Sequence, residues 1–307
     1  MNMIVSPAPH VFAKDSTQSL MLDVLIALIP TTVAGIIFFG FSAALVCLLS
    51  VVFCVGFEYL YQKLCKKPVR IGDLSAAVTG LILALNLPST APWWMILVGA
   101  LVAIVLTKQL YGGLGHNFMN PALAARAVLL ASWPAHMSGT AYVTPFDGVS
   151  SATFLAPESP IAGAVSTMDL FLGNIPGTIG EVSKIAILIG LAYLLIKQVI
   201  TWHIPVVMVG TFMVFSVICG QDPITSVLCG GILFGAVFMA TDYVSSPMTD
   251  LGKCIYAFGA GLIVALIRNF GSYPEGVTYG ILLMNVVTPL IDKALVPKVY
   301  GEVKQNA

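Results

Sequence analysis

Long apolar stretches separated by short polar ones form the dominant pattern of this chain. A helix that crosses a bilayer needs about 20 mostly apolar residues, and most of the stretches approach that length. The pattern therefore predicts an all-α polytopic membrane protein with about ten transmembrane helices and no visible soluble domain. The expected spans are 20–39, 42–62, 74–87, 93–110, 120–133, 184–200, 204–219, 224–240, 253–269 and 277–292. The spans at 74–87 and 120–133 are short, which is typical of broken or re-entrant helices.

Composition agrees with the membrane class. Of the 307 residues, 58% are hydrophobic and only 9% are charged, and the mean hydropathy is +0.95. Basic and acidic residues are equal at 14 each, so the charge balance predicts no nucleic-acid partner. The first apolar stretch follows a polar segment with Pro7 and Pro9, a pattern that does not predict a cleavable signal.

Cysteine and histidine spacing predicts no metal site. The six cysteines contain no Cys-x-x-Cys pair, and most sit in or beside apolar stretches, where the expectation is small buried side chains. The alternative that one cysteine contributes to an iron–sulfur cluster shared with another subunit stays open. The four histidines are scattered singly.

The distribution of Lys and Arg predicts the orientation. With the N-terminus in the cytoplasm, most basic residues fall on or near cytoplasmic segments, as the positive-inside rule expects. Both termini are then cytoplasmic, and the segment 134–183 lies outside with acids only, namely Asp147, Glu158, Asp169 and Glu181. A connection of about 50 residues is unusually long, and such loops are often functional.

The two halves of the chain resemble each other weakly. The stretch GLILALNLPSTAP at 80–92 is echoed by GAVFMATDYVSSPMT at 235–249, and GALVAIVL at 99–106 by GAGLIVAL at 259–266. Five spans per half would place the second half upside down relative to the first, which gives a five-plus-five inverted repeat. Such repeats place sites near the midplane at interrupted helices, here expected around 86–92 and 241–247. The alternative is that apolar helices resemble one another by composition alone.

Spans and orientation together divide the chain into five parts. The predicted parts are a cytoplasmic N-terminal segment at 1–19, a first five-helix membrane repeat at 20–133, an outer loop at 134–183, a second five-helix repeat at 184–292, and a cytoplasmic tail at 293–307.

A polar turn between two predicted spans is one candidate site. The segment KQLYGGLGHNFMNPALAAR at 108–126 places Asn117 and Asn120 just before Pro121, which can open a helix. The residues fit a polar pocket for a planar ligand. They fit equally a tight turn with an Asn cap.

Acidic residues inside the spans, or at their ends, form a second set of candidates. A carboxylate at membrane depth usually marks an ion path, a proton relay or a buried pair. Glu58, in VGFEYLYQ, is the sharpest case. Asp292, beside Lys293, is also open to interpretation as an interfacial salt bridge, and Asp23 and Asp242 as helix caps.

The outer loop contains the third candidate, the stretch DGVSSATF at 147–154. By itself, a stretch rich in Ser and Thr can serve solubility only.

Several motifs in order give the chain a family resemblance. The chain resembles the membrane subunits that include the D subunit of the Rnf complex, a ferredoxin:NAD⁺ oxidoreductase, and the B subunit of the Na⁺-pumping NADH:quinone reductase. The short N-terminal region favours the Rnf side. The matching motifs are Ser6–His10, Lys14–Gln18, Gly56–Glu58, Asn86–Pro88, Gly112–Pro121, Asp147–Thr153, Met239–Asp242, Val244–Ser245 and Pro274–Gly276.

The resemblance implies a role for the outer loop. In this family a flavin transferase recognises Asp-Gly-x-Ser/Thr-x-Ala-Thr and attaches FMN through its phosphate to the last threonine. That residue is Thr153, and the recognition pattern is intact at Asp147, Gly148, Ser150, Ser151 and Ala152.

The resemblance also implies a second flavin and an ion path. The family carries a non-covalent riboflavin in its membrane region, and the segment linked to it matches Asn117 and Asn120. Family acids implicated in ion uptake match Glu58 and Asp292, and Asp242 lies in a matching motif. None of the matched residues is a catalytic residue or a metal ligand.

The implied function is that of a membrane flavoprotein subunit of an enzyme complex in the bacterial cytoplasmic membrane. It would carry electrons between reduced ferredoxin and NAD⁺, coupled to Na⁺ or H⁺ translocation. Its partners would be the A, B, C, E and G subunits of the Rnf complex, the flavin transferase and membrane lipid. Two alternatives stay open: a flavin-free channel or solute transporter with a urea-channel-like inverted repeat, and a structural anchor for soluble redox subunits.

Overall fold

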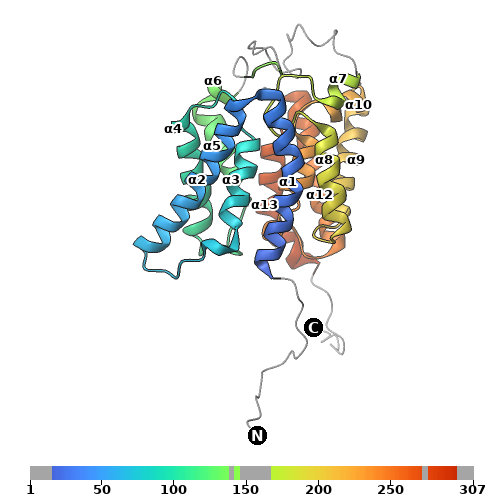
Figure 1. Cartoon of the computed structure of the whole chain (residues 1–307). Coiled ribbons are helices and arrows are strands. Elements are labelled where there is room, and N and C mark those ends of the chain that lie inside the picture. The colour runs from blue at the N-terminus through green and yellow to red at the C-terminus, as the bar shows by residue number, and fades with distance from the viewer. Residues whose placement is uncertain (1–15, 138–141, 146–166, 272–275, 296–307) are drawn as a thin grey trace, which may run out of the picture.

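A computed structural model of the chain describes residues 16–137, 142–145, 167–271 and 276–295. Within these ranges the protein is helical and contains no β-strand. The long helices run roughly along one common axis (Figure 1). We call the end of the bundle where α1 begins and α13 ends the lower end, as it is drawn in Figure 1, and the opposite end the upper end.

Helices of the first half occupy residues up to 137, and those of the second half follow from 167. The first set is α1 (Thr17–Phe39), α2 (Phe41–Leu64), the 3₁₀ turn η1 (Ile71–Asp73), α3 (Ser75–Leu85), α4 (Trp93–Leu101), the π-helix η2 (Val102–Gln109), α5 (Pro121–Ser132) and α6 (Pro134–Met137). The second set is α7 (Thr167–Leu172), α8 (Lys184–Ile196), α9 (His203–Ile218), α10 (Pro223–Leu228), α11 (Ile232–Phe234), the π-helix η4 (Gly235–Met239), α12 (Asp250–Phe270) and α13 (Val277–Ala294).

Local sequence signals explain where these helices start and stop. Ser16 and Ser19 form a capping box at the start of α1, in which each side chain accepts a hydrogen bond from the other residue's backbone N–H. Gly40 separates α1 from α2 with a φ of 70°, a conformation that glycine adopts without steric cost. Asn120 caps α5, and Pro121 occupies its first turn.

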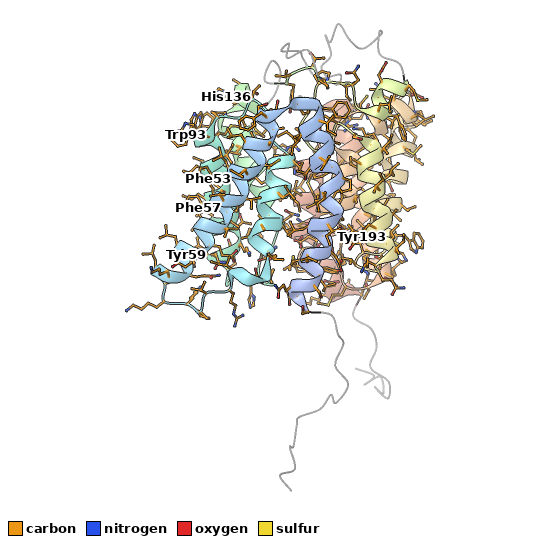
Figure 2. All side chains as sticks on the ribbon, in the orientation of Figure 1. Phe53, Phe57, Tyr59, Trp93, His136 and Tyr193 are labelled. Carbon is orange, nitrogen blue, oxygen red and sulfur yellow. The ribbon has the colours of Figure 1, made fainter. Side chains whose placement is uncertain are left out.

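The surface of the bundle is that of a membrane protein. The helices α1, α2 and α12 are long and apolar enough to cross a membrane, and shorter apolar helices lie beside them at Ser75–Leu85, Trp93–Gln109, Pro121–Ser132, Lys184–Ile196 and His203–Ile218. Large apolar side chains such as Leu48, which is 61% exposed, point outward along the spans. In Figure 2, Trp93 lies toward the upper end and Tyr59 and Tyr193 toward the lower end, which is the arrangement of aromatic belts at two bilayer interfaces.

The helix interruptions occur where the sequence predicts them. Residues 86–92 separate α3 from α4, and residues 240–249 separate η4 from α12. Asn86 at the first break donates to the carbonyl of Ile82 and to the sulfur of Met239, at the end of η4. The two breaks therefore come together inside the bundle.

Part of the predicted outer loop packs inside the bundle. The sequence places Glu181 in the outer segment 134–183, and in the structure residues 175–184 are buried and Glu181 is 5% exposed. The reason lies at the end of α3, where backbone carbonyls have no helical partner. The backbone N–H groups of Ile179 and Gly180 donate to the carbonyls of Leu87 and Leu85 and hold the segment inside the bundle.

Candidate functional site

A buried carboxylate with a lysine partner lies in the lower half of the bundle. Glu58 on α2 is 1% exposed and Lys108 on η2 is 2% exposed. The Lys108 Nζ atom lies 3.0 Å from Glu58 Oε1 and 3.1 Å from Oε2, and it donates to the Ser75 hydroxyl at 2.6 Å. Gln109 Nε2 donates to Glu58 Oε1 at 2.6 Å, and Gln62 Nε2 does so at 3.4 Å. We call these five residues the Glu58 cluster.

The π-helix η2 positions two neighbouring members of the cluster. Its wider turn is visible in the bonds from the Leu110 N–H to the Val105 carbonyl and from the Gly113 N–H to the Lys108 carbonyl, each five residues apart. Lys108 and Gln109 are adjacent in sequence, yet both reach Glu58. Single π-helical turns are rare and occur often at functional sites.

The Glu58 cluster lies against a polar cavity at the lower end. The cavity has a volume of about 610 Å³. Glu58, Gln62, Asp73 and Gln109 line it, together with the basic residues Lys67 and Arg70. The Glu58 carboxylate therefore lies at the wall of a polar cavity. We call it the lower cavity.

A second cavity lies between the two halves, and it contains the predicted asparagine pair. Asn117 and Asn120 line it, and so do Asp242 from the second half and Ser75 and Lys108 from the Glu58 cluster. We call it the central cavity. Its remaining walls are largely apolar and include Val78, Ile82, Val237 and Phe238.

The two asparagines have different roles in the fold. The Asn120 side chain caps α5 by accepting from the N–H groups of Ala122 and Leu123, and its Nδ2 donates to the Met239 carbonyl at 3.1 Å. This confirms the cap interpretation for Asn120. The Asn117 amide donates to the Met119 carbonyl at 3.1 Å and reaches Asp242 only at 3.5 Å, so Asn117 is the less constrained polar group facing the cavity.

The central cavity has a volume of about 100 Å³, and its lining resembles that of pockets for planar ring ligands such as a flavin. Pockets for such ligands are mostly apolar, with a few polar groups that fix orientation. Asn117 and Asp242 supply an amide and a carboxylate, and Phe238 with Val78 and Ile82 supplies apolar wall. These are the residues that would hold the ring.

The other predicted acids occupy separate places. Asp242 accepts from the Ser245 hydroxyl at 2.9 Å and lies at the break between η4 and α12. Asp292 lies near the lower end of α13 and accepts from the Met248 N–H at 3.1 Å. Asp23 is not a helix cap, because it lies within α1 and accepts from the Tyr193 hydroxyl at 2.7 Å. The structure therefore brings Asp242 to the central cavity and places Asp292 away from it.

A second buried charged cluster was missed by sequence reasoning. Arg126 on α5 donates through Nη1 to Asn86 and lies 3.5 Å from Glu181. The ammonium of Lys184, which is fully buried, donates to the backbone carbonyls of Glu181 and Gly230. We call Asn86, Arg126, Glu181 and Lys184 the Arg126 cluster. The available signal was Arg126, a charge in the middle of a predicted span.

The stretch from Asp147 to Thr153, which the sequence predicts to be an FMN attachment motif, lies outside the described residues. The six cysteines carry free thiols. Among the described residues, no group of His, Cys, Asp and Glu side chains could hold a metal ion.

Comparison with known proteins identifies the family. The model of the NQR2, RnfD, RnfE family matches residues 4–301. The chain belongs to this family.

Relatives in the NQR2, RnfD, RnfE family align over nearly their full length. The D subunit of the Na⁺-translocating ferredoxin:NAD⁺ oxidoreductase complex of Acetobacterium woodii is 50% identical, with 99% of this chain and 97% of the relative covered. The D subunit of the proton-translocating ferredoxin:NAD⁺ oxidoreductase complex of Clostridium ljungdahlii is 40% identical, with 97% and 96% covered. The D subunit of the ion-translocating oxidoreductase complex of Stutzerimonas stutzeri is 36% identical, with 94% and 93% covered.

Proposed function

We propose that this protein is the D subunit of an Rnf complex, in which it carries electrons between reduced ferredoxin and NAD⁺ in step with ion translocation. The observation that carries the proposal is the 50% identity, over 99% of the chain, to the D subunit of a ferredoxin:NAD⁺ oxidoreductase complex. The helical bundle with an apolar surface agrees with a membrane-embedded subunit of such a complex.

The proposed membrane arrangement is a five-plus-five inverted repeat of about ten spans in the bacterial cytoplasmic membrane. Helix α1 begins and α13 ends at the same end of the bundle, as an even number of crossings requires (Figure 1). The basic residues Lys67, Arg70 and Lys253 support placing this lower end in the cytoplasm. The loop with Thr153 then lies on the opposite side.

Two flavins are proposed as cofactors. Thr153 would hold FMN through a phosphoester, and the support is the intact recognition pattern at Asp147, Gly148, Ser150, Ser151 and Ala152. Riboflavin would bind in the central cavity, supported by Asn117 and the apolar wall around Phe238. When bound, the flavins supply the electron transfer, and the protein supplies position and insulation.

Ion uptake is proposed to begin at Glu58. Its carboxylate lies within an apolar span and lines the lower cavity, which is the arrangement expected of an ion path. Two of the relatives named above translocate Na⁺ and protons respectively, which supports one of these two as the cation. Asp242 at the central cavity and Asp292 at the lower end are proposed as later members of the path.

The proposal can be tested on the assembled complex purified from membranes. The denatured polypeptide should show flavin fluorescence on a gel and carry an added mass equal to FMN less water. Both signals should vanish in Thr153→Ala and persist in Thr140→Ala, a second threonine of the same segment outside the motif. The wild-type complex should also oxidise ferredoxin with NAD⁺.

Two results would contradict the proposal. A flavin-free wild-type polypeptide, produced together with a working flavin transferase, would favour a channel or transporter, and solute flux into proteoliposomes would then identify it. Ferredoxin oxidation at the full rate by a complex with Thr153→Ala would favour a structural anchor.

A further inference from the structure

We propose that Lys108 is an exchangeable internal counter-ion of Glu58, which closes the carboxylate to external cations until its ammonium turns toward Ser75. This inference rests on the proposed function, since it concerns the monovalent cation, Na⁺ or H⁺, that the complex would translocate. It assigns to Lys108 a positioning role that sequence reasoning did not suggest.

The contacts of Lys108 show an ammonium shared between two partners. Its Nζ atom bridges both Glu58 oxygens at 3.0 and 3.1 Å, while the bond to the Ser75 hydroxyl is shorter, at 2.6 Å. The Ser75 hydroxyl in turn donates to Asp73 Oδ1 at 2.7 Å. An ammonium that leaves Glu58 therefore keeps one strong hydrogen bond, to the Ser75 hydroxyl. A flexible four-carbon stem makes such a movement easy for lysine.

The carboxylate keeps a partner when the ammonium leaves. Gln109 Nε2 donates to Glu58 Oε1 at 2.6 Å independently of Lys108. The second oxygen, Oε2, would then be free to bind a cation from the lower cavity, which Glu58 lines. The exchange leaves no carboxylate without a polar partner, so it avoids the large cost of an uncompensated buried charge.

The position of the pair links the two cavities. Lys108 and Ser75 line the central cavity, whereas Glu58, Gln109 and Asp73 line the lower cavity. Negative charge that develops in the central cavity would attract the ammonium of Lys108, which lines that cavity, and the attraction is strong in a medium of low dielectric constant. The charges balance: one cation enters at Glu58 while one negative charge appears next to Lys108. Electron arrival and cation uptake would thereby be coupled through one side chain.

The test is carbodiimide labelling of Glu58 in the intact complex, read by mass analysis of the Glu58 peptide. Dicyclohexylcarbodiimide reacts with protonated carboxyl groups in apolar surroundings, where the carboxyl oxygen adds to its central carbon. Lys108→Met removes the counter-ion and favours the protonated form of the buried acid, so labelling should be about tenfold faster or more. Lys108→Arg should label like the wild type. Lys253→Met is the matched control, because Lys253 also pairs with an acid, Asp250, but at the surface.

Sodium protection gives a second readout. Without the internal competitor, the NaCl concentration that halves the labelling rate should fall about tenfold in Lys108→Met, if Na⁺ is the cation. If the cation is H⁺, NaCl should have no effect, and the faster labelling alone tests the counter-ion role. Labelling of Lys108→Met at the wild-type rate would overturn the inference.

A paired variant separates coupling from simple folding. Lys108→Met together with Glu58→Gln removes both charges, so the complex should assemble even if Lys108→Met alone does not. The inference predicts that this double variant oxidises ferredoxin but moves ions at less than about a tenth of the wild-type rate per electron. A double variant with wild-type ion movement would show that the pair is structural only. A wild-type complex that does not oxidise ferredoxin would refute the proposed function. The labelling experiment would still test the pairing of Lys108 with Glu58.

Discussion

The Glu58 cluster and the Arg126 cluster both bury opposite charges within the bundle, but they hold them differently. In the Arg126 cluster, the Lys184 ammonium donates to the backbone carbonyls of Glu181 and Gly230, which cannot move without the fold. In the Glu58 cluster, the Lys108 ammonium is held by the side chains of Glu58 and Ser75. Lys108 lines the central cavity, and Glu58 lines the lower cavity.

The partners of each buried ammonium indicate whether its charge has a structural role or can exchange its partner. A buried ion pair is weak evidence for stability by itself, although the loss of one partner is costly. A charge held by backbone carbonyls cannot change its partner unless the backbone moves, and here it ties the buried segment before α8 to the rest of the bundle. A pair held by flexible side chains beside two cavities can also exchange its partner. Variants in each cluster can show whether the two divide their roles in this way.

The largest effect is expected from Arg126→Met. This change leaves the Glu181 carboxylate buried without its guanidinium, and such losses destabilise proteins by about 3–5 kcal/mol. We expect little assembled complex, measured by size-exclusion chromatography of the solubilised membranes. Lys253→Met, at a surface pair, should assemble normally.

The double variant Arg126→Met with Glu181→Gln tests whether the Arg126 cluster, unlike the Glu58 cluster, serves only the fold. Removing both charges should restore most of the assembly, and ion transport should return with it. If assembly returns but ions no longer move, the Arg126 cluster also belongs to the ion path and the division of roles is wrong.

A medium effect is expected from Gly231→Ala. A Cβ atom at Gly231 would collide with the Glu181 carboxylate, whose Cδ would lie only 2.9 Å away. Overpacking of this kind costs about 1–3 kcal/mol, so the temperature of half-dissociation of the complex should fall. Gly56→Ala on α2 meets no atom within 4 Å and serves as the control. Equal thermal stability of the two variants would show that the Glu181 segment is loosely packed.

The smallest effect is expected from Gln62→Leu in the Glu58 cluster. Gln62 contributes a long 3.4 Å hydrogen bond to Glu58, and its Oε1 accepts from the Arg70 N–H at 2.9 Å. Loss of these bonds should lower stability by about 1 kcal/mol and leave ferredoxin oxidation unchanged. A loss of assembly as severe as that of Arg126→Met would mean that the Glu58 cluster is as rigid as the Arg126 cluster.

Local signals predict most of the helices and the two breaks at 86–92 and 241–247. The predicted span 224–240, however, is divided into α10, α11 and η4. Pro88 and Pro92 mark the break after α3, and the Asn120-Pro121 pair marks the start of α5. Glu58 stands out as a carboxylate inside an apolar span. In each case the information lies within a few residues of the feature.

The partners of the buried charges are not predictable in the same way. Lys108 is 50 positions from Glu58 in the sequence. It contacts the carboxylate because it lies on a π-helix, and the local sequence does not predict that kind of helix. The burial of Glu181 is not predictable for a related reason. A polar segment without helical periodicity is typical of an exposed loop. The segment around Glu181 is buried because its backbone donates hydrogen bonds to carbonyls at the end of α3.

Ion movement and electron transfer, measured together, decide whether Glu58 takes part in coupling. The purified complex would be placed in liposomes, supplied with reduced ferredoxin and NAD⁺, and followed for NADH formation and for accumulation of ²²Na⁺ or protons. We expect the wild type to couple the two, whereas Glu58→Gln should form NADH with ion accumulation reduced about tenfold or more. A Glu58→Gln complex that accumulates ions at the wild-type rate would contradict a role for this carboxylate in the ion path.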